Sequence, residues 1–155
     1  MRRPSPPPLP EPPTVEEIWE RAALPAPTIG VNPNGFGITG LETWLWTDAA
    51  QPIQLSVSLA GYTITGTATP VAYAFDTGDS TPTLSTAAGT EAEPAARHTY
   101  ETKGTYTLHV SSVWTAEATL TGPEIPTPIR IDLGTATLTA SRDYQVREIV
   151  TRLVD

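Results

Sequence analysis

Residues 105–121 alternate between apolar and polar side chains over a longer stretch than any other part of the chain. The apolar members occupy the even-numbered positions Tyr106, Leu108, Val110, Trp114, Ala116, Ala118 and Leu120. Because successive side chains of a strand point to opposite faces, a period of two predicts a β-strand that buries one face. The stretch is much longer than the roughly five or six residues of a typical strand. We therefore expect one long strand, bent or twisted near Ser111 and Ser112.

Shorter segments on both sides of this stretch show the same period. They are residues 43–46, 53–59, 62–67, 71–75, 129–133 and 144–153, the last of which is also compatible with a short helix. Ala60 and Gly61 separate two of these segments in a pattern typical of a hairpin turn. Pro70 and Gly134 are expected to end strands, since proline lacks the amide that a ladder needs and glycine weakens pairing. Residues 77–97 show no period and are interpreted as a long loop. About seven short strands separated by turns predict an all-β sandwich.

The first forty residues lack this alternation. Residues 1–13 hold seven prolines, whose fixed φ and missing amides predict an extended spacer; the alternative is a ligand for an SH3-like domain. Thr14 and Glu17 then form the pattern of a capping box, and Ile18 and Trp19 belong to the apolar stripe of a short helix. Because a helix this short is marginal in water, Trp19 is expected to dock on the protein itself.

Length, composition and charge limit the class of protein. The patterns divide the chain into a Pro-rich spacer at 1–13, a short capped helix with an irregular strap at 14–40 and a β-sandwich at 41–155. The net charge of −8 argues against a nucleic-acid partner, which needs clustered Lys and Arg. The lack of cysteine excludes disulfides and thiolate zinc sites. No apolar run approaches the roughly 20 residues of a transmembrane helix.

Two segments of the predicted sandwich each join an aromatic strand to a turn. The first carries Tyr73, Phe75, Asp76, Gly78 and Asp79, and the second carries His98, Tyr100, Gly104 and Tyr106. Together they resemble the PKD domain, an immunoglobulin-like β-sandwich of extracellular proteins, in which an aromatic-x-Phe-Asp-x-Gly-Asp-Gly segment precedes His-x-Tyr and Gly-x-Tyr. The resemblance covers roughly residues 62–120 and departs from the signature at Ser80, where a second glycine is usual. It implies that the aspartates and Gly78 bend the chain, and that Tyr100 ties the loop backbone through its hydroxyl, like a tyrosine corner.

Asp76 also begins an Asp-Thr-Gly segment like that of the aspartic proteases. Their chemistry requires two such carboxylates that share one proton. This chain has a single copy, and Asp79 places a further charge beside it. The sequence therefore argues against a protease.

A metal site is the other chemistry that these residues suggest. Calcium requires six or more oxygens, which Asp76 and Asp79 could supply only with help from residues such as Glu91, Glu93 and Glu101. No segment has the spacing of a calcium loop, and His98 and His109 are too isolated for a zinc cluster. We expect no metal and no cofactor, and a structural role for the two aspartates.

The functional expectation follows from the resemblance and from the tryptophans. The resemblance implies a non-catalytic adhesion, spacer or interaction module outside the cell or at its surface, with a protein or a cell-wall polysaccharide as its partner. Eight Arg to one Lys, with abundant Ala, Pro and Thr, is typical of a GC-rich, actinobacterial genome. The start of the chain lacks the apolar core of a signal peptide, so export would depend on a signal outside this sequence.

Trp44 and Trp46 share one face of a predicted strand. The alternative function is therefore a polysaccharide-binding module that stacks sugars on these two rings, while Trp114 is expected in the core. A single-lobe aspartic protease built on Asp76 is the third alternative.

Overall fold

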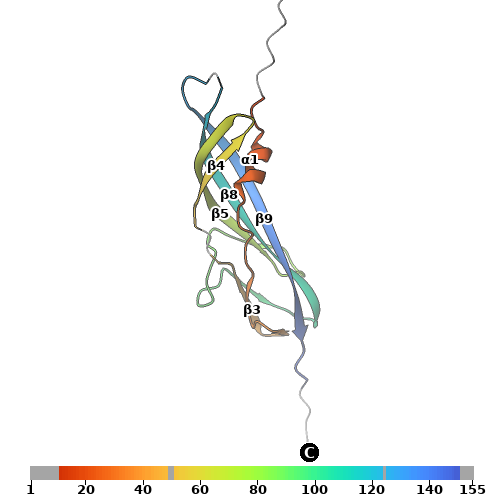
Figure 1. Cartoon of the computed structure of the whole chain (residues 1–155). Helices are drawn as coiled ribbons and strands as arrows, with labels where there is room; N and C mark the ends of the chain where they lie inside the picture. The colour runs from red at the N-terminus through yellow and green to blue at the C-terminus, as the bar shows by residue number, and fades with distance from the viewer. Residues whose placement is uncertain (1–10, 49–50, 124, 151–155) are drawn as a thin grey trace, which may run out of the picture. The chain divides into compact units, whose positions relative to one another are not determined.

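The computed structural model describes residues 11–48, 51–123 and 125–150 (Figure 1). Most of the predicted Pro-rich spacer and the end of the last predicted strand lie outside the described residues. The elements in chain order are α1 (Val15–Ala22), β1 (Gly30–Asn32), β2 (Gly37–Ile38), β3 (Glu42–Trp46), β4 (Ile53–Leu59), β5 (Tyr62–Asp76), β6 (Thr83–Ser85), β7 (Ala96–Thr99), β8 (Gly104–Thr121) and β9 (Ile129–Arg147). The predicted all-β class with one short N-terminal helix is confirmed.

The strands form two sheets. Sheet A has three antiparallel strands in the order β1-β3-β7. Sheet B has the order β2-β9-β8-β5-β4, and β6 pairs with part of β5. All the paired strands whose register is resolved are antiparallel except β2, which runs parallel to β9. The more specific assignment, a PKD-type immunoglobulin sandwich, stays a prediction.

Two strands, β5 and β9, are longer than the sequence predicts, because two expected breaks do not occur. β5 continues through Pro70. On one side of β5, pairing with β4 ends at Ala68 and pairing with β6 begins at Tyr73, and Pro70 lies between these two paired segments. β9 continues through Gly134, which adopts a φ of 65° and donates its amide to Asp132 Oδ1 at 2.8 Å. The expectation of short strands was therefore wrong for β5 and β9, which have 15 and 19 residues. The 18 residues of β8 match the single long strand predicted there.

Two regions interpreted as irregular contain short strands. The irregular strap within residues 14–40 includes β1 and β2, and the loop at 77–97 includes β6 and the start of β7. These strands have two to four residues. Such short segments carry too few positions to show alternation, and hydrogen bonds to a neighbouring strand define them instead.

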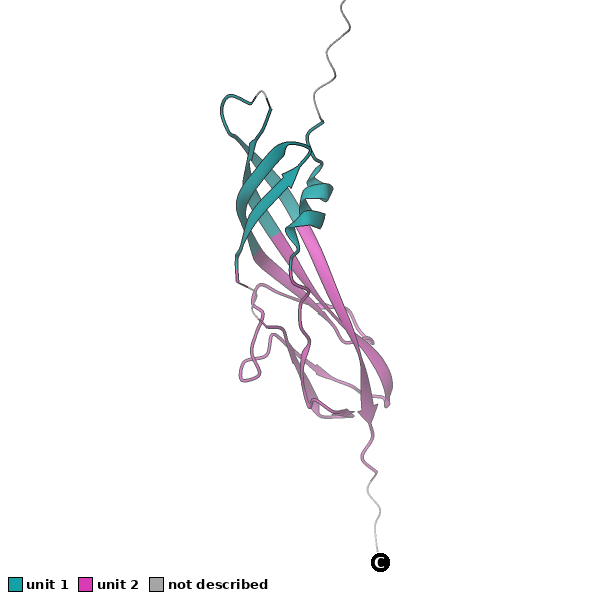
Figure 2. Cartoon of the chain, viewed as in Figure 1, with its two compact units in different colours: residues 1–24, 52–69, 115–135 teal, residues 25–51, 70–114, 136–155 magenta. Residues whose placement is uncertain are grey.

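The first of two compact units comprises residues 1–24, 52–69 and 115–135 (Figure 2). The capping box predicted for α1 is present, since Glu17 N donates to Thr14 Oγ1 at 3.2 Å. Ile18 is buried, and Trp19 donates its indole N–H to the Leu133 carbonyl at 2.9 Å. The expectation that Trp19 docks on the protein itself is thereby confirmed.

The same unit contains the predicted hairpin of β4 and β5. Leu59 pairs with Tyr62 next to a two-residue turn in which Ala60 and Gly61 both have positive φ. Positive φ at both central residues matches the right-handed twist of the flanking strands. The register fixed by this turn places Leu55 opposite Gly66.

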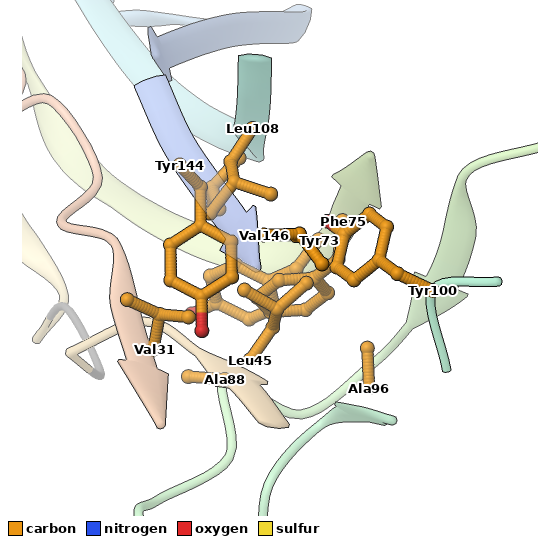
Figure 3. Packing of buried hydrophobic residues seen from close by; sticks show 11 residues of the cluster. Val31, Leu45, Tyr73, Phe75, Ala88, Ala96, Tyr100, Leu108, Tyr144 and Val146 are labelled. Atoms are coloured by element: carbon orange, nitrogen blue, oxygen red, sulfur yellow. The ribbon is translucent and has the colours of Figure 1, made fainter. Parts of the chain in front are cut away.

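The second unit comprises residues 25–51, 70–114 and 136–155 and holds the main hydrophobic core. Figure 3 shows this cluster, to which strands of both sheets contribute. Its members are Val31, Leu45, Tyr73, Phe75, Ala88, Ala96, Tyr100, Leu108, Val110, Tyr144 and Val146. The even-numbered residues of β8 from 108 to 118 are buried, as the alternation predicts. Trp114 is fully buried, which confirms its expected place in the interior.

Candidate functional site

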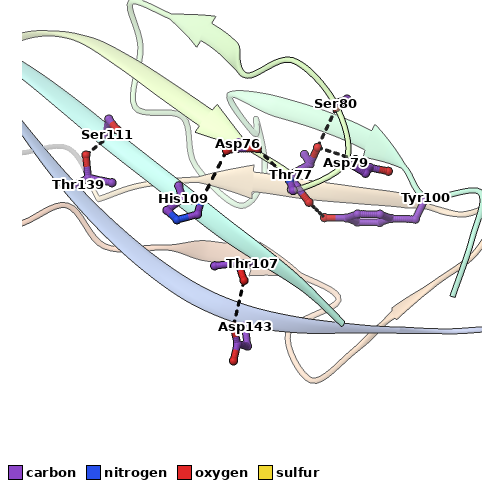
Figure 4. Close-up of polar contacts among 11 residues, drawn as sticks. Asp76, Thr77, Asp79, Ser80, Tyr100, Thr107, His109, Ser111, Thr139 and Asp143 are labelled. Carbon is purple, nitrogen blue, oxygen red and sulfur yellow. Dashed lines mark hydrogen bonds and ion pairs between the residues drawn. The ribbon is translucent and has the colours of Figure 1, made fainter. Parts of the chain in front are cut away.

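The turn after β5 is built by hydrogen bonds between its own residues (Figure 4). Asp76 Oδ1 accepts the amide of Gly78 at 2.9 Å, and Gly78 has a φ of 92°. Thr77 Oγ1 lies 2.9 Å from both Asp79 Oδ1 and Ser80 Oγ. Ser80, which stands where the PKD signature has glycine, thus adds a hydrogen bond to the turn.

Tyr100 connects this turn to the core. Its hydroxyl donates to the Thr77 carbonyl at 2.8 Å, and the side chain is fully buried. Its ring centroid lies 4.5 Å from that of Tyr106 and 4.6 Å from that of His98. A buried carbonyl outside a ladder requires a donor, and Tyr100 supplies one from another segment of the chain.

The two histidines contact the two aspartates of the turn. His98 Nε2 lies 2.8 Å from Asp79 Oδ1, and His109 Nδ1 lies 3.6 Å from Asp76 Oδ2. Each carboxylate thus contacts both its own turn and a histidine from another strand. Within residues 11–48, 51–123 and 125–150, no group of three or more His, Asp and Glu side chains is arranged to hold a metal ion.

The remaining motif residues lie in or against the core. Tyr73 and Phe75 are buried, and Tyr106 is half-buried against the same cluster. Gly104 starts β8, and the Tyr106 hydroxyl donates to the Thr102 carbonyl just before this strand. The structure therefore brings both motif segments together around one turn and one core.

Burial raises the pKa of several tyrosines. The pKa values of Tyr100, Tyr144 and Tyr73 lie above the ordinary value of 10.0, with desolvation as the largest cause for each. The negative charge of Asp79 adds to the effect at Tyr100, while Thr43 and Arg142 partly oppose it at Tyr144. The folded protein thus keeps phenolic protons that the unfolded chain would release.

We expect the free energy of unfolding to fall as the pH rises above 10. A tyrosine whose pKa is higher in the folded than in the unfolded protein stabilises the fold fully at any pH below the unfolded pKa. This stabilisation is lost progressively as the pH rises from the unfolded pKa toward the folded pKa. The expected slope is up to about 1.4 kcal/mol per pH unit for each phenol that stays protonated. Urea unfolding between pH of about 8 and about 11 measures it. Tyr100→Phe should reduce the slope, and a urea midpoint that does not move across this window would contradict the prediction.

Sheet A has two tryptophans on one of its faces. Thr43, Leu45 and Thr47 are buried, whereas Trp44 and Trp46 alternate with them and are half-buried. The two tryptophans therefore lie on the face of sheet A that points away from the core. The sequence predicted their shared face, and whether they bind a ligand stays a prediction.

Trp46 lies against a glycine of the neighbouring strand. Gly30 is its direct partner on β1, and a Cβ added to Gly30 would lie 2.2 Å from Trp46 Cε2. The indole thus occupies the space that any other side chain at position 30 would need. Such an arrangement, in which an aromatic ring covers a cross-strand glycine, also helps to fix strand register.

Trp44 is held by two charged neighbours. Its indole N–H donates to Glu42 Oε2 at 2.9 Å, and the guanidinium carbon of Arg97 lies 5.1 Å from the ring centroid. Arg97 Nη1 in turn lies 3.6 Å from Glu42 Oε2. Both charged side chains are more than half exposed, so these three side chains form a fixed but accessible group.

A carboxamide and a second carboxylate lie beside this group. Asn32 is the β1 partner of Trp44, and Asn32 Nδ2 donates to Glu91 Oε1 at 3.4 Å. We call the set of Asn32, Glu42, Trp44, Trp46, Glu91 and Arg97 the sheet A platform. Glu91, which the sequence suggested as a possible calcium ligand, accepts a hydrogen bond from Asn32 in the structure.

The sequence indicated only part of this platform. Glu42 precedes Trp44 by two residues, so alternation alone would have placed it on the same face. Arg97 and Asn32 come from segments without a readable period, and only the pairing Trp44↔Arg97 and Asn32↔Trp44 brings them there. No local pattern could have identified them.

Comparison with protein-family models, with curated proteins and with solved structures finds no match for the chain. In the described part of the chain, no helix has both the length and the apolar character needed to cross a membrane.

Proposed function

We propose that the protein is a non-catalytic interaction module that acts outside the cell or at the cell surface and binds its partner through the sheet A platform. The observation that carries the proposal is the combination of Trp44 and Trp46 on an outward sheet face with fixed, accessible charged groups. Aromatic residues and Arg are enriched where proteins bind partners. Half-buried rings held by neighbours are also presented with little loss of side-chain freedom.

The contacts of the two motif aspartates support a structural rather than a catalytic role. Asp76 accepts the Gly78 amide, and Asp79 contacts both Thr77 and His98. An aspartic protease would instead direct two carboxylates at each other and at a water molecule. The proposal therefore treats Asp76 and Asp79 as parts of the scaffold.

The same turn supports the proposed PKD-type relationship. The resemblance to that family implies that Tyr100, in the His-x-Tyr segment, ties the loop backbone through its hydroxyl. Here the Tyr100 hydroxyl donates to the Thr77 carbonyl. The core receives side chains from strands of both sheets, as a sandwich requires. From this relationship and from the arginine-rich composition we propose an exported protein of an actinobacterium.

Binding to isolated cell envelopes tests the proposed function. We expect the full chain to co-sediment with envelopes of the producing organism, and Trp44→Ala/Trp46→Ala to reduce the bound fraction about tenfold or more, because interface tryptophans often dominate binding. Cell fractionation of the native product should also recover it outside the cytoplasm.

Phe36→Ala provides a matched control for that experiment. Phe36 is exposed, and its ring centroid lies 4.0 Å from the Arg147 guanidinium carbon. The two residues form another aromatic–arginine pair in the same unit, outside the platform. The Phe36→Ala variant should leave envelope binding unchanged. Equal binding by the wild type and the double variant, or recovery of the native product from the cytoplasm, would overturn the proposal.

A further inference from the structure

We infer that the sheet A platform binds a neutral saccharide, with the two indoles as stacking surfaces and the polar side chains as hydrogen-bonding groups. The inference rests on the proposed function, because it names the ligand of the same surface. It follows from three features of the platform: the spacing of the rings, the fixed polar groups beside them and the distribution of charge.

The two rings are arranged along one strand. Residues two apart on a strand project from the same face, roughly 6.5–7 Å from each other. Trp46 packs on the Gly30 backbone, which bears no side chain, so nothing at position 30 projects beyond the ring. Adjacent apolar rings at this spacing suit the apolar faces of successive sugar rings in an oligosaccharide.

Polar groups that fit hydroxyls are already fixed beside the rings. Glu42 is held by the Trp44 indole and by Arg97, and Asn32 is held by Glu91. Carboxylates accept hydrogen bonds, a guanidinium donates them and a carboxamide does both, so together they match the mixed donor and acceptor character of sugar hydroxyls. Because they are oriented before binding, less side-chain entropy is lost when a ligand arrives.

The mixture of rings and charges favours a sugar over a protein partner. The centre of a typical protein interface is depleted in charged residues and buries roughly 800 Å² on each side. On the platform, Trp44 itself contacts both Glu42 and Arg97, so no apolar centre separates the rings from the charges. A hydroxyl-rich ligand can replace the water around these groups with hydrogen bonds, whereas an apolar protein surface would remove that water and supply none.

The charge of the platform narrows the class of saccharide. The platform contains two carboxylates, Glu42 and Glu91, and one guanidinium, Arg97, which leaves a net negative surface. The whole chain is also negative, with a net charge of −8. Anionic polysaccharides such as polyuronates are therefore disfavoured, and neutral sugars, including N-acetylated ones, are preferred.

Affinity electrophoresis with protein-free polysaccharides tests this inference. The probes are soluble β-glucan, xylan, mannan and N-acetylglucosamine oligomers as neutral ligands and polygalacturonate as the anionic one. We expect at least one neutral probe to retard the full chain and polygalacturonate not to do so. Trp46→Ala and Trp44→Ala should each weaken binding about tenfold or more, and Trp46→Phe, which keeps a ring over Gly30, should retain most of it.

Two further variants separate sugar binding from other causes. Glu42→Gln/Glu91→Gln removes both negative charges but keeps side chains that can hydrogen-bond, so a neutral sugar should lose about threefold or less, whereas a basic peptide would lose far more. Phe36→Ala should have no effect. The urea unfolding midpoint of each variant, compared with that of the wild type, establishes that loss of binding is not loss of fold.

The outcomes distinguish failure of this inference from failure of the proposed function. If the chain binds envelopes in a Trp44- and Trp46-dependent way but binds no neutral polysaccharide, the saccharide assignment is overturned. The proposal that the protein is an interaction module would still stand. Preference for polygalacturonate, or collapse of binding in Glu42→Gln/Glu91→Gln, would also overturn it. If neither envelopes nor any probe bind, both proposals fail.

Discussion

Replacing Tyr100 by alanine is expected to lower the free energy of unfolding by about 3–5 kcal/mol. Tyr100 is fully buried, packs against Tyr106 and His98 and donates to the Thr77 carbonyl. The substitution removes a large aromatic side chain from the core and leaves that carbonyl without its donor. Both losses act on the same turn, so this single position should be among the most sensitive in the unit. Urea unfolding followed by tryptophan fluorescence measures the change.

Tyr100→Phe separates the contribution of the ring from that of the hydroxyl. It keeps the packing and removes only the hydrogen bond to Thr77, so we expect a loss of about 1–3 kcal/mol, the cost of an unsatisfied buried carbonyl. If Tyr100→Phe were as destabilising as Tyr100→Ala, the packing with Tyr106 and His98 would contribute little. If neither variant lowered stability by 1 kcal/mol, on the scale of a single buried hydrogen bond, Tyr100 would not hold the turn.

Replacing Gly66 by valine is expected to destabilise the first unit by about 3 kcal/mol. A Cβ at Gly66 would lie 2.2 Å from the Glu117 carbonyl oxygen and 2.8 Å from Ala118 Cα. Both are backbone atoms of β8, so a rotamer change cannot relieve the collision and strands β5 and β8 must move apart. The thermal and urea midpoints should fall together, and the hairpin register that places Leu55 opposite Gly66 should be disturbed.

Gly66→Ala and Gly35→Ala provide a graded series for this prediction. Gly66→Ala meets the same backbone atoms with less bulk, so its cost should be smaller but still above about 1 kcal/mol. An added Cβ at Gly35 would meet no atom within 4 Å, so that variant should change stability by no more than about 0.5 kcal/mol. A valine at position 66 that is tolerated as well as an alanine at position 35 would show that β5 and β8 are not in the close contact described.

Local sequence signals predicted the features that depend on neighbours along the chain. The capping box of Thr14 and Glu17 requires only residues three apart, and it is present. The hairpin turn at Ala60 and Gly61 depends on backbone freedom at adjacent positions, and it too is present. The alternation in β8 predicted which of its side chains are buried. In each case the signal that predicts the structure lies in residues within a few positions of one another.

The two strand ends that were expected at Pro70 and Gly134 do not occur. Proline at position 70 was expected to end β5, but that rule holds only where the missing amide faces a neighbouring strand. Here β4 pairs only as far as Ala68 and β6 only from Tyr73, so Pro70 costs the ladder no hydrogen bond on that side. Gly134 was expected to end a strand, but the Asp132 side chain accepts its amide instead. Only the three-dimensional pairing shows which rule applies.

The amino-acid order by itself determined the all-β class, the capped helix and the shared face of Trp44 and Trp46, because periodicity, capping and turn propensity are properties of contiguous residues. The tertiary structure alone decided that Tyr100 reaches the Thr77 carbonyl and that Asn32, Arg97 and Glu91 surround the tryptophans. These contacts join residues many positions apart. They form only when the free energy gained by burying the core outweighs the entropy lost in closing the loops between them. A local sequence pattern does not indicate which distant segments come into contact.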